Sequence, residues 1–245
     1  MSHARCTHLR SHGNEIALDA VLADVARSSV DRLVCLGDTA TLGPRPEAVL
    51  ARLRDLGCPC IMGNHDAFML DPDLIRAYRD TPPVVLDAVD WCRDRLSTQD
   101  LDFIRGFVPT MEISLDGGAR LFLFHGTPRS HMEDLLCTTP ALVLDEMLAG
   151  HQATLMACGH THIQMLRQHR GTLIVNPGSV GLAFEQFVDG QTPTLLPHAE
   201  WASVEASAAG VEVRLHRVHL DRAAMRAAAK ASDNPLAPML VGSYS

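Results

Sequence analysis

Residues 31–66 read DRLVCLGDTATLGPRPEAVLARLRDLGCPCIMGNHD, and this stretch decides the fold. The apolar residues at 31–36 predict a short buried strand that ends at Gly37-Asp38. Residues 60–62 predict a second strand, which ends at Gly63-Asn64-His65-Asp66, and residues 46–56 between the two have the apolar spacing of a helix. A strand, a helix and another strand in this order predict a parallel sheet layer that presents polar residues at its strand ends.

The flanking sequence extends this pattern in both directions. Residues 15–26 have helical spacing after Asn14, a residue suited to an N-cap, and residues 71–107 are mostly helical, with Ser97 or Thr98 capping 99–105. Later strands, mostly antiparallel, are predicted at 110–115, 120–124, 154–158, 164–167, 172–175, 201–205 and 211–218, with helices at 141–148 and 221–229. We therefore expect an α/β (α+β) fold, a four-layer α/β/β/α sandwich of two mixed sheets. One domain would span 1–245, with 232–245 as a C-terminal tail.

Ligand-type side chains follow four of the predicted strands. Beside the two motifs above, His125-Gly126 follows the strand at 120–124, and Gly159-His160-Thr161-His162 follows the strand at 154–158. A single histidine after a strand is more often a structural residue than a ligand. Several such groups in Gly-rich turns at strand ends instead indicate a site where side chains converge on a bound ion or phosphate.

The set resembles the motifs of the calcineurin-like metallophosphoesterases, which have a metallo-dependent phosphatase-like fold. Their pattern is Asp-x-His, Gly-Asp, Gly-Asn-His-Asp/Glu, a lone His and Gly-His-x-His. His12-Gly13-Asn14, Gly43-Pro44 and Asn176-Pro177-Gly178-Ser179 add a resemblance to the small bacterial branch of YfcE-type phosphodiesterases. The resemblance runs from about residue 12 to about residue 220.

This resemblance implies two divalent ions, of which manganese is expected first and iron, nickel or zinc are alternatives. The implied metal ligands are His12, Asp38, Asn64, His125, His160 and His162. Asp38 would bridge the ions, and a shared hydroxide would attack phosphorus. Asn64 and His65 would contact the substrate, and His65 would protonate the leaving oxygen while Asp66 orients its imidazole.

The first motif departs from the family pattern, because Arg10 stands where the aspartate of Asp-x-His belongs. A guanidinium cannot bind a cation, so the ion at His12 and His162 should be weakly held. Read one nucleotide later, the codons for Cys6 to Arg10 permit Ala-Leu-Ile-Ser-Asp, an apolar strand that ends in aspartate. Two hypotheses follow: compensated insertions or deletions scrambled the first strand at 1–11, or the chain diverged to a metal-poor protein. Sequencing the locus distinguishes them.

The expected function is hydrolysis of a small phosphate ester, a phosphodiester in the first place. A phosphomonoesterase or protein phosphatase is the alternative within the class, and a non-catalytic scaffold that has lost metal is the alternative outside it. A net charge of −8 without a basic cluster argues against general nucleic-acid binding. No apolar run approaches the ~20 residues of a membrane span, so we expect a cytoplasmic protein without a membrane partner. A homo-oligomer is left open.

Overall fold

The computed structural model describes residues 4–28, 30–78, 81–188 and 191–244, with backbone alone for 4–9. Its strands are β1 (Ala4–Leu9), β2 (Arg32–Cys35), β3 (Thr110–Ser114), β4 (Arg120–Phe124), β5 (Leu155–Ala157), β6 (Gln164–His169), β7 (Thr172–Pro177), β8 (His198–Ser207) and β9 (Gly210–His219). Its α-helices are α1 (Glu15–Arg27), α2 (Pro46–Asp55), α3 (Asn64–Leu70), α4 (Asp73–Arg76), α5 (Pro83–Arg93), α6 (Thr98–Arg105), α7 (Ala141–Met147), α8 (Arg222–Ala231) and α9 (Ala237–Ser243). A 3₁₀ turn, Asp116–Gly118, joins β3 to β4.

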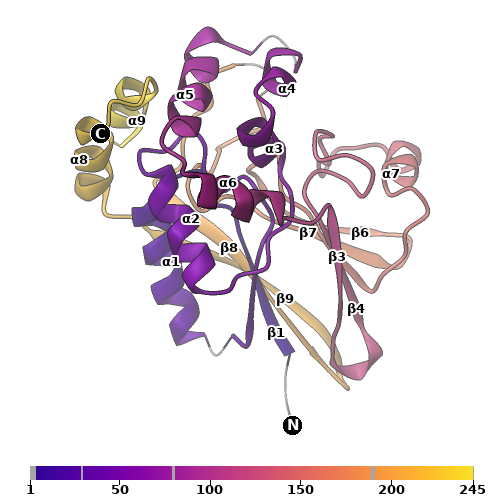
Figure 1. The fold of residues 1–245 in the computed structure, drawn as a ribbon. Coiled ribbons are helices and arrows are strands. Elements are labelled where there is room, and N and C mark those ends of the chain that lie inside the picture. Colours follow the sequence, from indigo (N-terminus) through magenta and orange to yellow (C-terminus); the bar gives the residue numbers. More distant parts are fainter. Residues whose placement is uncertain (1–3, 29, 79–80, 189–190, 245) are drawn as a thin grey trace.

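The strands form two mixed sheets (Figure 1). One has the order β2-β1-β8-β9, in which β1 pairs in parallel with β2 and antiparallel with β8. The other has the order β3-β4-β5-β7-β6, with β4, β5 and β7 parallel and both edge strands antiparallel. The first strand therefore lies inside its sheet, and its carboxyl end reaches the same edge as that of β2.

Alternation along the strands packs the two sheets face to face. Val34 and Leu36 point between the sheets, where they meet Leu121, Leu123 and other apolar side chains of the second sheet. These residues are fully buried. Cys35, between them, is buried on the opposite face. A continuous apolar run of this kind is typical of a strand covered on both sides, so we expect helices outside the sheet.

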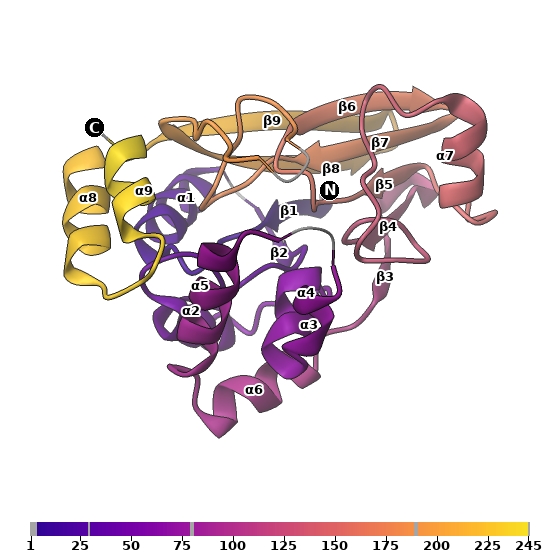
Figure 2. The ribbon, with the colours of Figure 1, turned by 90° about the horizontal axis from the view of Figure 1, so that it is seen from above.

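Helices supply the two outer layers (Figure 2). Leu18 of α1 and Leu50 of α2 belong to a cluster that also contains Trp201, on the outer face of β8. On the far side, Phe122 of β4 packs with Leu144 of α7. The predicted four-layer α/β/β/α sandwich of two mixed sheets is thus confirmed.

Two helices have the N-cap residues that the sequence predicted. The side chain of Asn14 accepts a hydrogen bond from the Ala17 N–H at 3.1 Å and caps α1. Of the two candidates before α6, Ser97 is the cap, and its hydroxyl accepts from the Asp100 N–H at 3.2 Å. Each cap satisfies one of the backbone donors that a helix start leaves free.

Other predictions need correction. Residues 60–62 form only isolated parallel bridges, Cys35 to Cys60 and Ile61 to Val108, because each of these residues meets a single partner rather than a continuous ladder. The predicted tail at 232–245 contains α9, whose Leu240 is buried in a cluster with α8. Of the predicted first-strand segment at 1–11, residues 1–3 and the side chains of 4–9 lie outside the described part of the chain. Within the described chain, the helices are all too short or too polar to cross a bilayer.

Candidate metal centre

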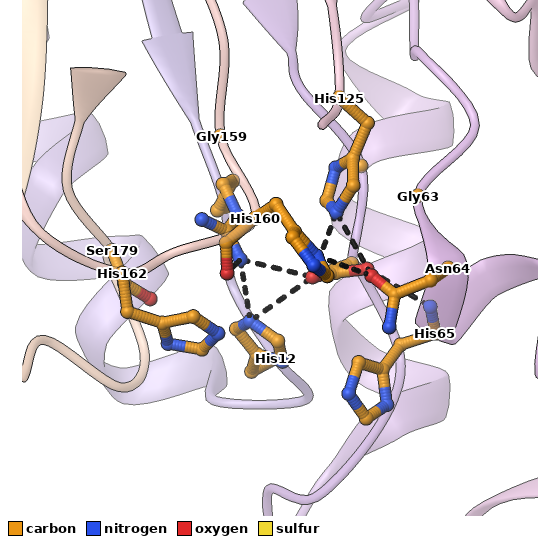
Figure 3. A network of polar contacts seen from close by, with 12 residues as sticks. His12, Gly63, Asn64, His65, His125, Gly159, His160, His162 and Ser179 are labelled. Atoms are coloured by element: carbon orange, nitrogen blue, oxygen red, sulfur yellow. Dashed lines mark hydrogen bonds and ion pairs between the residues drawn. The ribbon is translucent and has the colours of Figure 1, made fainter. Parts of the chain in front are cut away.

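Five turns bring the predicted ligands to one place, at the edge where β1, β2, β4 and β5 end (Figure 3). Four of the side chains extend from backbone with positive φ: His12 (47°), Asp38 (54°), His160 (65°) and His162 (62°). Residues other than glycine rarely adopt this conformation, which costs about 1–3 kcal/mol at each position. Such strain at four neighbouring positions is typical of functional sites.

One group of ligand atoms is formed by Asp38, Asn64, His125 and His160. The Asn64 Oδ1 lies 3.0 Å from the His125 Nε2 and 2.9 Å from the His160 Nδ1. The Asp38 Oδ2 lies 3.2 Å from the same His125 nitrogen. Asp38, His125 and His160 also place one ligand atom each within 4.8 Å of one another. The group therefore has the compact oxygen and nitrogen donor set that a divalent transition metal requires.

In His125 and His160, the ring nitrogen that points away from Asn64 makes a polar contact, and this contact determines which nitrogen keeps its lone pair toward Asn64. His125 donates its Nδ1–H to the Leu36 carbonyl, so its Nε2 keeps a lone pair. The His160 Nε2 lies 3.2 Å from the Asp134 carboxylate, so the lone pair of His160 is on Nδ1, toward Asn64. Lone pairs and the Asn64 oxygen then face one another at about 3 Å, an arrangement that a cation between them would stabilise. Carbonyl and carboxylate contacts of this kind are typical of histidines that bind metal.

The second group consists of His12, Asp38 and His162. The rings of the two histidines are stacked with centroids 4.5 Å apart, and each offers a nitrogen within 4.8 Å of the Asp38 carboxylate and of the other ring. His162 donates its Nδ1–H to the Leu182 carbonyl at 2.6 Å, which leaves its Nε2 free to ligate. Burial lowers the pKa values of His12 and His162 well below the usual range, so both imidazoles are neutral.

Arg10 lies inside this second group. Its Nη2 is 2.9 Å from the Asp38 Oδ2, 3.4 Å from the His12 Nε2 and 3.1 Å from the His160 carbonyl oxygen. The side chain is fully buried and passes over Gly159, where an added Cβ would lie 2.7 Å from its Cδ. A guanidinium nitrogen thus occupies the space between the ligand atoms and bonds the carboxylate that an ion would need. The residues of this second position do not fit a metal ion, whereas those of the first position do.

Asp38 is ionised between the two groups. Burial alone would raise its pKa, but the charged contacts of its carboxylate, the Arg10 guanidinium among them, hold the pKa well below its usual range. The other carboxylate oxygen, Oδ1, accepts the His65 backbone N–H at 3.0 Å. Asp38 therefore supplies a fixed negative charge, with one oxygen held by the α3 N-terminus and the other shared between Arg10 and the ligand groups.

Asp66 has a different role from the predicted one. Its Oδ2 accepts the backbone N–H groups of Asp38 (2.6 Å) and Gly63 (3.0 Å). Its Oδ1 accepts the N–H and the hydroxyl of Thr39 at 2.8 and 2.6 Å. The carboxylate is fully engaged in holding the Asp38 turn and is not the partner of the His65 imidazole, so the expected orienting contact is corrected.

His65 lies beside Asn64 and lines the cavity next to the ligand groups. Its ring packs edge-on against Phe68 at 5.2 Å, and its Nδ1 is buried without a hydrogen-bond partner among the described atoms. Burial lowers its pKa to about 4, so the imidazole is neutral at pH 7 in the free protein. A phosphate anion next to the ring would raise that pKa and would give the unpartnered nitrogen a hydrogen-bond partner.

The chain belongs to the calcineurin-like phosphoesterase superfamily, whose domain matches residues 3–196. It is similar to the uncharacterized protein MJ0912 of Methanocaldococcus jannaschii, at 28% identity over 171 residues that cover 70% of this chain and 67% of that one. A metallophosphoesterase from Sphaerobacter thermophilus is 25% identical, with a TM-score of 0.74 and 98% of each chain covered. The hypothetical protein PH1004 of Pyrococcus horikoshii OT3 shares the fold at 16% identity, with a TM-score of 0.79 and coverage of 99% of this chain and 97% of that one.

The predicted superfamily is therefore confirmed, and with it a phosphoesterase class that implies divalent metal ions. The six predicted ligands lie together, and their metal binding stays a prediction. Sequence reasoning missed Asp134 and the carbonyls of Leu36 and Leu182, which orient the histidine ligands. Asp134 lies in an irregular segment without periodicity, and a carbonyl contact has no residue signature, so the sequence held no signal for either.

Proposed function

We propose that this chain hydrolyses small phosphate esters, phosphodiesters in the first place, at the group formed by Asp38, Asn64, His125 and His160. The observation that supports the proposal is the facing set of lone pairs on Asn64, His125 and His160 about 3 Å apart, with the outer nitrogens of both rings already engaged. A structural cluster of neutral histidines would instead pair donors with acceptors. The proposed ion is manganese, with iron, nickel or zinc as alternatives.

The residues of the chain have distinct tasks in this reaction. A divalent ion held here supplies positive charge to the phosphoryl oxygens and lowers the pKa of water. Asp38 anchors that charge, and the Asn64 side chain lies where it contacts both ligand histidines. His65 lines the cavity beside Asn64. A neighbouring phosphate anion would raise its pKa, so that the imidazole takes up a proton from water and would then give it to the leaving oxygen.

Arg10 changes the family's two-ion scheme. Because its guanidinium fills the position at His12 and His162, no step is assigned to a second ion. Its positive charge is fixed at any accessible pH and balances Asp38. The proposed reaction therefore uses one ion, together with the permanent charge of Arg10 beside the Asp38 carboxylate.

The test is release of p-nitrophenolate from bis-p-nitrophenyl phosphate and from p-nitrophenyl phosphate, with manganese, iron, nickel or zinc added in turn. We expect turnover that depends on the metal and is faster with the diester. His125→Ala should abolish it, whereas His169→Ala, which removes a histidine paired with Asp145 away from the site, should not. Faster turnover of the monoester would favour the phosphomonoesterase or protein phosphatase alternative.

One observation favours a second candidate, a non-catalytic scaffold. The Arg10–Asp38 ion pair is buried, and the Arg10 charge already balances the Asp38 carboxylate, which reduces the site's demand for a cation. Loss of turnover with every metal, together with a stable complex with another protein, would support the scaffold. Metal bound at one equivalent per chain and turnover that requires His125 would exclude it.

A further inference from the structure

The cavity beside the ligand groups has two chemically different ends. It encloses about 230 Å³. Its polar end contains Asp38, Asn64, His65 and His160. The opposite end is walled by apolar side chains from three parts of the chain: Leu182, Phe184, Leu195, Leu236, Met239 and Leu240. The catalytic groups account for the first end only, so the apolar end requires its own explanation.

The apolar wall is built by defined contacts on both sides. On one side, Phe184 and Leu195 form an antiparallel bridge, supported by the bond from the Glu185 N–H to the Thr194 carbonyl at 3.0 Å. On the other side, the Asn234 amide donates to the carbonyls of Leu42 and Gly43 at 3.2 and 3.0 Å and fixes the start of α9. Figure 2 shows α8 and α9 side by side at one end of the molecule, and Met225 of α8 and Leu240 of α9 belong to one hydrophobic cluster.

The apolar wall begins directly beside the ligands. The Phe184 ring stacks on the His162 imidazole with centroids 4.1 Å apart and an interplanar angle of 13°. His162 and Phe184 both line the cavity, so an ester whose phosphorus lies at the polar end can extend its organic group toward Phe184. Met239 and Leu240 of α9 line the same cavity.

The charges around this cavity disfavour substrates that carry a second anionic group. The carboxylates in its lining, Asp38 and Asp134, lie at the polar end beside His160. Among the described lining residues there is neither lysine nor arginine. A second phosphate or a carboxylate on the substrate would have to enter the apolar end without a counter-charge, and burying an unpaired anion in such surroundings is costly.

We propose that the apolar end is a specificity site for one uncharged aromatic group of the phosphate ester. This inference rests on the proposed function. The size agrees, because an apolar cavity of ~150 Å³ is enough to hold benzene, and the whole cavity, its polar end included, is about 230 Å³. The substrate class is thus a phosphodiester with a single negative charge and an aryl substituent, in preference to a nucleoside polyphosphate or a sugar phosphate.

The experiment compares two p-nitrophenyl phosphodiesters with the same leaving group. One carries a phenyl group and the other a 4-carboxyphenyl group, and in each reaction water forms the new P–O bond while p-nitrophenolate leaves. With manganese, kcat/KM should be at least about tenfold higher for the phenyl ester. Met239→Lys should reduce or reverse that ratio by adding a cation to the apolar wall. Leu195→Lys repeats the test from the other wall, and Met239→Leu should retain the ratio.

A matched control places the same charge elsewhere. Leu142 on α7 is 73% exposed and far from this cavity, so Leu142→Lys should leave the ratio unchanged. If the wild type hydrolyses both esters equally well, or if both lysine variants fold and keep the wild-type ratio, the inference is wrong while the proposed function stands.

Calorimetry separates failure of the inference from failure of the proposed function. Phenylphosphonate and 4-carboxyphenylphosphonate cannot be hydrolysed in this way, so their binding in the presence of manganese does not depend on catalysis. Tighter binding of phenylphosphonate, lost in Met239→Lys, would support the aromatic site even if no ester is turned over. Equal affinity for the two phosphonates, or no measurable binding of either, would overturn it.

Discussion

Replacing Arg10 by aspartate exchanges a fixed positive charge for a ligand in the position between His12, Asp38 and His162. The Arg10 Nη2 lies 2.9 Å from the Asp38 Oδ2, and neither side chain is exposed by more than 1%. At an effective dielectric constant near 20, two unit charges ~4 Å apart interact by about 4 kcal/mol, and a divalent ion in this position would be repelled by about twice that amount. We therefore expect Arg10→Asp to strengthen ion binding there by several orders of magnitude.

The assay is metal analysis after equilibration with manganese and removal of free ion. The wild-type chain should retain about one ion, and Arg10→Asp about two. Arg10→Gln removes the repulsion without adding a carboxylate and should give intermediate occupancy, while Arg10→Lys should stay at one. Without metal, Arg10→Asp places two carboxylates in one buried site. The free energy of unfolding should therefore fall by ~3–5 kcal/mol, and the melting temperature should fall with it. Adding manganese should restore both.

Two results would refute this reasoning. Tight binding of two ions by the wild-type chain would show that the Arg10 side chain leaves the ligand group when metal is offered. A single ion in Arg10→Asp, with the protein folded, would show that His12 and His162 do not form a metal position even when the charge is correct.

Three further predictions concern single residues. Asp38→Asn should lose the bound ion and nearly all turnover, because an amide removes the charge that holds the cation; metal retained at the wild-type level would exclude Asp38 as a ligand. His65→Ala should reduce turnover by ~10²–10⁴-fold with unchanged metal content, and a metal loss as large as that of His160→Ala would contradict the role given to His65. Burial raises the pKa of Glu200 to about 7, above its value in the unfolded chain, so the folded protein loses stability as pH rises from about 4.5 to 7. Glu200→Gln should remove that pH dependence, which amounts to up to about 3 kcal/mol in the free energy of unfolding at pH 8. Melting curves at pH 5 and pH 8 test this, and an unchanged pH dependence in the variant would contradict it.

The sequence predicted the layers of the fold because a short apolar run that ends at a polar turn is a strong local signal. Val34 and Leu36 pack on one face of the segment that contains β2, and Cys35 packs on the other, as expected for a strand covered on both faces. Residues 60–62 read as the same kind of strand but form only isolated bridges. Pairing depends on what lies alongside, and a three-residue apolar run carries no information about that.

The sequence predicted which residues form the site better than it predicted the contacts between them. Gly-Asp and Gly-His-Thr-His at strand ends brought the ligands to one edge, since the carboxyl ends of parallel strands meet there. The partner of Asp66 was predicted incorrectly, because adjacency to His65 in sequence says nothing about where a side chain at the start of α3 points. The role of α9 as a cavity wall was missed for a similar reason: the helix is short, and it reaches the cavity through the distant anchor at Asn234.

The correction at Asp66 also explains how the strained turns persist. Asp38 has a φ of 54°, which a non-glycine residue adopts only when its surroundings hold it there. The Asp66 carboxylate accepts the N–H groups of Asp38, Thr39 and Gly63, so one buried anion holds the turn after β2 against the start of α3. Burial, followed by the nearby Asp38 charge, raises the pKa of Asp66, and these donors oppose that rise. Asp66 therefore fixes the position of Asp38, and in the proposed reaction its part is to keep the Asp38 carboxylate where a cation can meet it.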